Sequence, residues 1–144
     1  GRSAVIAPCA EGMIGLSICY DIRFPHLYRA YAQAGAELIA APAAFTRVTG
    51  EAHWHVLQRA RAIENGAYVI APGQCGTLSG GADCYGHSLI VDPWGRVLAD
   101  GGTEPGIITA EIDLALVAET RRRIPSLTHD RAFAPACLAR AQAS

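Results

Sequence analysis

The stretch MIGLSICYDIRFP, from Met13 to Pro25, decides the fold of this chain. Its first part, Met13–Ile18, is a short apolar run with β-branched side chains, and such a run predicts a buried strand. Pro25 suits the first turn of a helix, which we expect to continue to about Ala34. Cys19 therefore lies at the end of a predicted strand and just before a predicted helix.

The residues after this stretch repeat the same alternation. Gly66 lies where a glycine commonly ends a helix. The residues over 92–95, Asp-Pro-Trp-Gly, are typical of a hairpin turn. We expect strands over residues 37–41, 67–71, 85–91, 96–99 and 106–112, a loop over 45–50, and helices over 51–65 and 114–123. One apolar face of each central helix is expected to point to the core: Leu27, Tyr31 and Ala34 on the first, and Val56, Ala60, Ile63 and Ala67 on the second.

This order of elements indicates the fold class. Strand–helix–strand–helix–strand, followed by strands in hairpin order, is typical of an α/β fold with a mixed sheet. A chain of 144 residues is long enough for one domain with a hydrophobic core.

Composition argues against several classes of partner. The formal net charge is −1 and the pI about 6.6, without a basic stripe, so we expect no nucleic-acid partner. No apolar run approaches the ~20 residues of a membrane helix and no signal-peptide pattern opens the chain. We therefore expect a cytoplasmic protein that does not contact a membrane.

The cysteines indicate reduced thiols and no metal. Five widely spaced cysteines are an odd number in a chain that is not small, which argues against a disulfide framework. Cys75, Cys84 and His87 do not match the ligand spacing of a zinc site, so we interpret them as structural residues. His87 is expected to be a hydrogen-bonded core histidine.

Cys19 is the candidate nucleophile. A residue between a strand and a helix is exposed at the carboxyl edge of the sheet, where open α/β sheets place their sites. The backbone N–H of Tyr20 can point at a developing oxyanion, and a helix N-terminus favours the reactive thiolate. The alternative is a buried structural cysteine, which is common in proteins.

Six ordered motifs decide between these alternatives, because together they resemble the nitrilase superfamily over about residues 12–130. The resemblance is greatest to the Nit branch, which includes deaminated-glutathione amidase and ω-amidase. The motifs occupy Gly15–Pro25, Ala41–Phe45, Thr49–Asn65, Gln74–Gly76, Tyr85–Ser88 and Val91–Gly95.

The resemblance implies a fold and a chemistry. Members form a four-layer α-β-β-α sandwich with a mixed sheet and assemble as dimers or larger oligomers. Their Glu–Lys–Cys triad hydrolyses an amide or nitrile through a thioester, with no metal or organic cofactor. Carried over to this sequence, Cys19 is the nucleophile and the Tyr20 N–H supports the oxyanion.

The sequence departs from that pattern in one respect. It contains no lysine, and only Glu11 precedes Cys19, too close to it to be the family's base. We therefore expect residues 1–144 to be the C-terminal portion of a single carbon–nitrogen hydrolase domain, with 125–144 as its tail. Such an incomplete chain is expected to be inactive alone.

Further residues are candidates for substrate binding. An arginine at the position of Arg23 can hold a substrate carboxylate through two hydrogen bonds, although an ion pair with Asp21 or Glu37 is an equal alternative. Phe45 and Thr46 follow a strand end and are placed to form a pocket wall.

Other polar residues are interpreted as structural or as part of an interface. His53 and His55 suggest a Cys–His dyad, but the resemblance implies that this histidine–tryptophan segment is structural. Arg59, Arg61 and Glu64 are expected on a charged helix face that meets a partner subunit.

The leading hypothesis is an amidase that acts on a small carboxylate-bearing amide. One alternative is a non-catalytic binding or oligomerisation fragment. The other is a nitrilase or an N-carbamoyl amidohydrolase.

Overall fold

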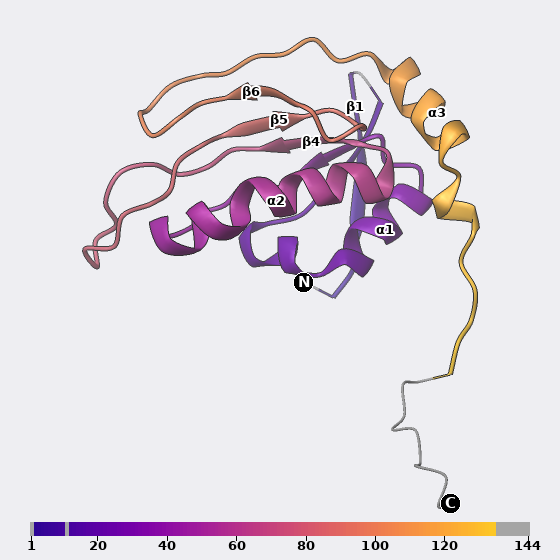
Figure 1. Ribbon diagram of the computed structural model, residues 1–144, viewed down its shortest axis with the longest axis horizontal. Coiled ribbons are helices and arrows are strands. Elements are labelled where there is room, and N and C mark those ends of the chain that lie inside the picture. The colour runs from indigo at the N-terminus through magenta and orange to yellow at the C-terminus, as the bar shows by residue number, and fades with distance from the viewer. Residues whose placement is uncertain (1, 11, 135–144) are drawn as a thin grey trace, which may run out of the picture.

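A mixed six-stranded sheet forms the centre of the computed structural model, which describes residues 2–10 and 12–134 (Figure 1). The strands lie side by side in chain order, so the predicted α/β class with a mixed sheet is confirmed. They are β1 Val5–Cys9, β2 Gly12–Leu16, β3 Leu38–Ala40, β4 Tyr68–Ala71, β5 Leu89–Val91 and β6 Val97–Asp100. The helices are α1 Pro25–Gln33, α2 Arg47–Asn65 and α3 Leu114–Arg123, with short 3₁₀ helices η1 Cys19–Arg23 and η2 Ser126–Thr128.

Three neighbouring strands of the sheet are parallel. β2 pairs with β3, and β3 with β4, in registers that align Ile14 with Leu38 and Leu38 with Tyr68. α1 connects the first pair and α2 the second, as the alternation predicts. The carboxyl ends of all three strands therefore meet at one edge of the sheet, where the segment beginning at Cys19 leaves β2.

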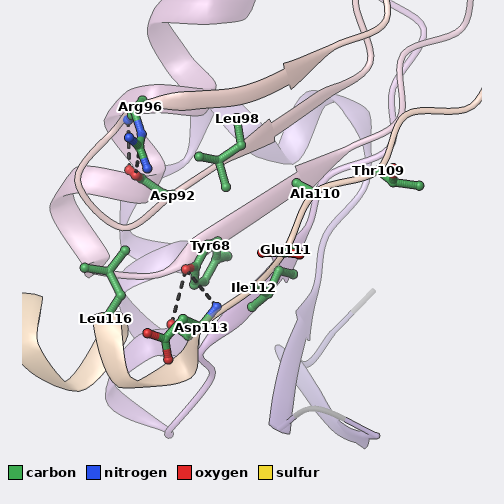
Figure 2. Close-up of a pocket in the computed structure, with 10 residues that line it drawn as sticks. All are labelled: Tyr68, Asp92, Arg96, Leu98, Thr109, Ala110, Glu111, Ile112, Asp113 and Leu116. Atoms are coloured by element: carbon green, nitrogen blue, oxygen red, sulfur yellow. Dashed lines mark hydrogen bonds and ion pairs between the residues drawn. The ribbon is translucent and has the colours of Figure 1, made fainter.

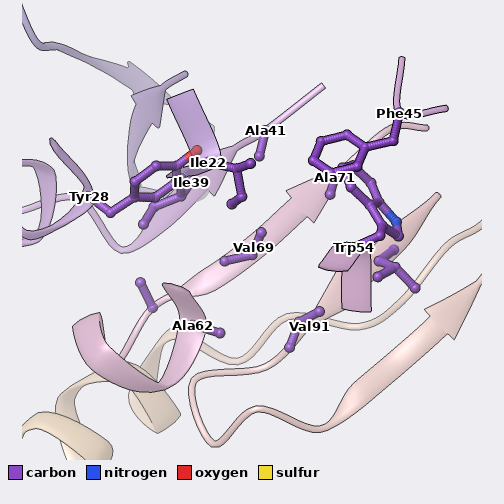
Figure 3. Close-up of a cluster of buried hydrophobic side chains, with 12 residues drawn as sticks. Ile22, Tyr28, Ile39, Ala41, Phe45, Trp54, Ala62, Val69, Ala71 and Val91 are labelled. Atoms are coloured by element: carbon purple, nitrogen blue, oxygen red, sulfur yellow. The ribbon is translucent and has the colours of Figure 1, made fainter. Parts of the chain in front are cut away.

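α1 and α2 cover one face of this sheet, and the main core lies between these helices and the sheet (Figure 3). Tyr28 from α1 and Trp54 from α2 are almost completely buried against apolar side chains of the strands. Those strand side chains include Ile39, Val69 and Val91. Burial of such side chains contributes about 1.5–3 kcal/mol each relative to exposure.

The opposite face of the sheet is only partly covered. Val117 of α3 packs there on Leu38 and Tyr68, together with half-buried side chains such as Leu98 and Ile112. An open groove of ≈ 950 Å³ runs over this face, and the Tyr68 hydroxyl at its floor bonds the Asp113 backbone (Figure 2). The described residues thus form one α layer and one β layer of the four that the resemblance implies, with α3 beside them.

The predicted hairpin is confirmed and a buried carboxylate holds its turn. Asp92 accepts hydrogen bonds from the N–H groups of Trp94 and Arg96, both at 2.9 Å. Gly95 has a φ of 83°, which favours glycine. β5 and β6 consequently pair antiparallel on either side of this turn.

Two predicted element boundaries and one predicted strand are wrong. α2 begins at Arg47, so much of the expected loop over 45–50 is helical. The strand expected over 85–91 begins only at Leu89, because His87 has a left-handed backbone with φ of 52°. Residues 106–112 form no strand, because they cross the second face of the sheet without pairing with a strand.

The predicted buried faces of the helices are also partly wrong. In α1, Ala34 follows the helix and is exposed, whereas Tyr31 is buried as expected. In α2, Val56 and Ile63 are 65% and 50% exposed. The face of α2 toward the sheet instead carries Trp54, Gln58, Arg61, Ala62 and Asn65. Periodicity located a real apolar stripe on α2, but that stripe faces outward.

The end of the chain has little regular structure where it is described. η2 follows the proline that ends α3, and residues 129–134 form neither helix nor strand. The remainder of the expected tail, 135–144, lies outside the described residues, as does Glu11. Among the described helices, none combines the length and apolar character that a membrane crossing requires.

Candidate active site

Cys19 occupies a strained turn immediately after β2. Its φ is 49°, in the left-handed region that residues other than glycine rarely adopt. Its N–H donates to the Pro42 carbonyl at 2.7 Å, which fixes the turn against the segment that follows β3. The side chain is partly exposed. A strained, partly exposed cysteine at the carboxyl edge of a sheet fits a nucleophile better than a buried structural thiol.

Asp21 supports the turn from within. Its Oδ2 accepts the N–H of Ile18 at 2.9 Å, and its own N–H donates to the Ile18 carbonyl at 3.0 Å. These reciprocal bonds close the backbone around Cys19.

Arg61 of α2 holds the turn from outside. Its guanidinium is almost completely buried and donates to the Ile22 carbonyl at 2.9 Å and 2.6 Å. It also donates to Glu64 at 2.9 Å and lies 5.5 Å from the Tyr28 ring centroid. The expected Arg61–Glu64 pair is therefore confirmed. The expected place of Arg61 on a charged face that meets a partner subunit is wrong, because its side chain turns inward to the Ile22 carbonyl of η1.

A buried hydroxyl pair lies beneath β2. Ser17 Oγ and the Tyr28 hydroxyl are 2.7 Å apart, and Ser17 Oγ donates to the Ala40 carbonyl. Burial raises the pKa of Tyr28 to about 12 although its hydrogen bond with Ser17 acts in the opposite direction. Tyr28 therefore remains a neutral phenol and joins α1 to β2, which leads to Cys19.

Arg23 lies between two aromatic rings. Its Cζ is 5.5 Å from the Tyr20 ring centroid and 5.3 Å from that of Phe45, and its guanidinium lies 3.4 Å from His53 Nδ1. Within residues 2–10 and 12–134 it forms no ion pair, so the alternative pairing with Asp21 or Glu37 is not observed. The structure thus joins three predicted site residues, Tyr20, Arg23 and Phe45, in one cluster.

Phe45 and Thr46 play different structural parts. The Phe45 ring is buried and lies 4.9 Å from that of Trp54, which fixes its position beside Arg23. Thr46 is the exposed N-cap residue of α2, and its hydroxyl bonds that of Thr49 at 3.0 Å. Thr46 is therefore adjacent to the cluster along the chain rather than a member of it.

The two histidines of α2 do not form a dyad with Cys19. His53 faces Arg23, and His55 Nε2 lies 3.0 Å from Asp100 Oδ2. His87 Nδ1 lies 2.8 Å from the other oxygen of the same carboxylate, so its hydrogen bond is observed as expected, although the side chain is not fully buried. Burial raises the pKa of Asp100, but the Gly102 N–H and the two imidazoles outweigh burial and leave it below its usual value.

Cysteines take no part in that histidine–aspartate cluster. Among the described residues, the one group of three side chains able to hold a metal ion is His55, His87 and Asp100. The cluster itself was missed, because its members are separated by 32 and 13 positions and share no motif.

The fold and the cysteine turn define a class, that of α/β proteins with a partly exposed cysteine after a strand at the carboxyl edge of the sheet. Within that class, the carbon–nitrogen hydrolase family model matches residues 2–122, and the chain belongs to this family of the nitrilase superfamily. A deaminated glutathione amidase of Synechocystis sp. is 52% identical over 118 residues, which are 82% of this chain and 43% of that protein. The chain thus spans less than half the length of this relative.

Solved structures agree with the family and the fold. Saccharomyces cerevisiae Nit3, of branch 10 of the nitrilase superfamily, matches with a TM-score of 0.85 and 39% identity, over 92% of this chain and 49% of that one. A mutant amidase from Nesterenkonia sp. AN1, with acrylamide added at its active-site cysteine, matches with a TM-score of 0.70 and 29% identity. That match covers 87% of this chain and 48% of the amidase.

Arg61 was missed as a residue that holds the turn containing Cys19, although its position on the buried face of α2 was open to prediction. An arginine four positions before Asn65 and seven after Trp54 shares their helix face. The helix spacing therefore contained the signal, but the charge of the residue led to its assignment to a subunit interface.

Replacing Arg61 by lysine is expected to lower the free energy of unfolding by about 1.5–3 kcal/mol, because one ammonium cannot reproduce the planar set of bonds to Ile22 and Glu64. Denaturant unfolding of the purified protein measures this. The matched control is Arg122→Lys, on the exposed surface of α3, with a change below about 0.5 kcal/mol. Equal stability of both variants would contradict the anchoring role of Arg61.

Proposed function

We propose that the complete protein containing this chain is an amidohydrolase that cleaves a small carboxylate-bearing amide, with Cys19 as the nucleophile. The observation that carries this proposal is the left-handed backbone of Cys19 at the carboxyl edge of the parallel strands. It is supported by membership of the carbon–nitrogen hydrolase family and by an amidase relative whose active-site cysteine is covalently modified.

The reaction proceeds in two halves. A base removes the thiol proton, the sulfur attacks the amide carbon, and the Tyr20 N–H donates to the oxyanion. Collapse breaks the C–N bond, the nitrogen takes the proton and leaves as ammonia or an amine, and a thioester remains. Water then attacks the thioester, which releases the carboxylic acid and returns the proton to sulfur.

The general base and an oxyanion-stabilising lysine belong to residues outside this chain. The sequence has no lysine, and Glu11, the one glutamate before Cys19, is too close to it along the chain to be the family's base. We propose that residues 1–144 are the C-terminal portion of one hydrolase domain, ending in the tail 125–144. The half-buried sheet face with the ≈ 950 Å³ groove is where the remaining sheet of the four-layer sandwich packs. Isolated residues 1–144 are accordingly inactive.

Arg23 supplies substrate selectivity in this proposal. Its guanidinium lies within 5.5 Å of the Tyr20 and Phe45 ring centroids and contacts His53 Nδ1, and in this proposal a substrate carboxylate takes the place of that histidine contact. Thr46, the exposed residue next to Phe45 in the chain, is proposed to contact the substrate once it is bound beside Arg23. No metal or organic cofactor takes part in the hydrolysis, and the near-neutral net charge fits a cytoplasmic enzyme without a nucleic-acid or membrane partner.

Cys19→Ala in the complete protein is expected to lower amide hydrolysis by about 10⁴-fold or more, because no other group forms the thioester. Ammonia release from deaminated glutathione and from ω-amide acids measures the rate, and intact mass after acid quench detects the acyl-enzyme.

The same assay separates the alternatives. Turnover confined to nitriles or carbamoyl compounds would select the nitrilase or N-carbamoyl amidohydrolase alternative. A complete protein without any turnover would favour a non-catalytic binding or oligomerisation module and refute the amidase.

Arg23→Met is expected to raise KM for a carboxylate-bearing amide by about 10- to 100-fold, because it removes hydrogen bonds to a charged group. KM for a matched amide that lacks the carboxylate stays unchanged. Arg23→Lys keeps the charge and gives an intermediate value. Equal losses on both substrates would show that Arg23 acts on the fold instead.

We also propose that the outer face of α2 packs on a second copy of the protein. Val56 and Ile63 lie along that face, and Trp94 at the hairpin turn is 51% exposed. Arg59 ties the turn to the helix through a bond to the Gly95 carbonyl at 2.7 Å. A contiguous apolar surface of this kind is typical of an interface.

Ile63→Asp is therefore expected to shift the complete protein from a dimer or larger oligomer to a smaller species, because a charge is then buried without a partner. Light scattering after size exclusion measures the mass. Ala34→Asp is the control, because Ala34 is exposed and follows α1 on another part of the chain. An unchanged mass for Ile63→Asp would place the interface elsewhere.

A further inference from the structure

We propose that His55, His87 and Asp100 bind one divalent transition-metal ion of the zinc type, at a structural site separate from Cys19. The ligand atoms are His55 Nε2, His87 Nδ1 and a carboxylate oxygen of Asp100, and they all lie within 4.8 Å of one another. The proposal does not depend on amide hydrolysis.

The distances suit one shared ion. His55 Nε2 lies 3.0 Å from one oxygen of Asp100, and His87 Nδ1 lies 2.8 Å from the other. Zinc binds imidazole nitrogen and carboxylate oxygen at about 2.0–2.2 Å, so ligand atoms around one ion are roughly 3–4 Å apart. An ion therefore takes the place of the protons between these groups with only small movements of the side chains.

The three ligands come from three elements that the fold brings together. His55 is in the middle of α2, His87 precedes β5, and Asp100 ends β6. α2 packs against β5, and β5 pairs with β6 (Figure 1). The ligands are thus positioned by the sheet and the helix rather than by a flexible loop, which favours defined coordination.

The backbone of His87 is held in an unfavourable conformation that aims its ring at the carboxylate. Its φ is 52°, its N–H donates to the Gly102 carbonyl at 2.6 Å, and its carbonyl accepts from Trp54 Nε1 at 2.6 Å. Asp100 Oδ1 accepts the Gly102 N–H at 2.9 Å. One turn at Gly102 therefore fixes two of the three ligands.

Tyr85 supports both imidazoles from the next layer. Its hydroxyl lies 3.4 Å from His55 Nδ1, and its ring is stacked on that of His87 with centroids 4.4 Å apart. A hydroxyl that accepts the Nδ1 proton leaves the Nε2 lone pair of His55 available for a metal. Ligating histidines in metal sites commonly have such a partner on their second nitrogen.

The cluster is open enough to exchange an ion. The exposed fractions of the side chains are 32% for His55, 24% for His87 and 34% for Asp100. Three protein ligands leave coordination positions for water, as two histidines and one carboxylate do at other transition-metal centres. The bound ion would tie α2 to the β5–β6 hairpin.

The test is a titration of the complete, tag-free protein with ZnCl₂, in the Cys19→Ala background so that the nucleophile thiol cannot compete. We expect one Zn²⁺ per chain by calorimetry and by metal analysis after gel filtration, with a rise in Tm on binding. His55→Ala and Asp100→Asn each lose that equivalent and the rise in Tm. Tyr85→Phe weakens binding about 10- to 100-fold.

His26→Ala is the matched control, because His26 is an exposed histidine on α1 away from the cluster, and it retains the zinc equivalent. Circular dichroism verifies that each variant is folded, and Asp100→Glu, which restores a carboxylate, recovers part of the binding. Substitution by Co²⁺ gives visible d–d bands without the near-ultraviolet thiolate charge-transfer band. A thiolate band, a zinc equivalent that survives both His55→Ala and Asp100→Asn, or the absence of any saturable zinc binding would overturn the proposal.

Discussion

The candidate site depends on a buried positive charge. Arg61 is removed from water in the middle of α2, and a guanidinium is stable there only if its donors are used. The Ile22 carbonyl, the Glu64 carboxylate and the face of Tyr28 together meet that requirement. Because Ile22 is three residues after Cys19, the need to satisfy one charge also fixes the turn that presents the thiol. Packing and chemistry are thereby joined through a single side chain.

The sheet was open to prediction because its strands carry a local signal. Buried parallel strands are continuous apolar runs, and Leu38–Ala40 and Tyr68–Ala71 each follow a helix that ends at a small residue, Ala34 or Gly66. The orientation of α2 could not be predicted from such a local signal. Val56 and Ile63 do form an apolar stripe, yet Gln58 and Asn65 face the core. Periodicity finds the apolar side of a helix, but it does not distinguish the core of one chain from an interface with another.

In the candidate site, too, some positions follow from the sequence and others only from the three-dimensional structure. The position of Cys19 and Tyr20 between a strand and a helix follows from sequence neighbours alone, whereas their roles as nucleophile and oxyanion donor stay predictions. The placement of Arg23 against Phe45 depends on the parallel pairing that brings the ends of β2 and β3 together, so it appears only in three dimensions. The His55–Asp100 contact spans 45 positions and depends on how α2 lies across the hairpin. No motif records such a contact.

The Cys19 turn and the His55–His87–Asp100 cluster share one feature, a strained backbone. Across the described residues, Cys19 and His87 are the non-glycine positions with positive φ, and each is held by a backbone hydrogen bond from its own N–H. Such a conformation costs on the order of 1–3 kcal/mol, which glycine would largely avoid. If the role of residue 87 were only to form this turn, a glycine would do so with less conformational free energy. The strained backbone instead places an imidazole beside Asp100, just as the strained turn at Cys19 presents a partly exposed thiol.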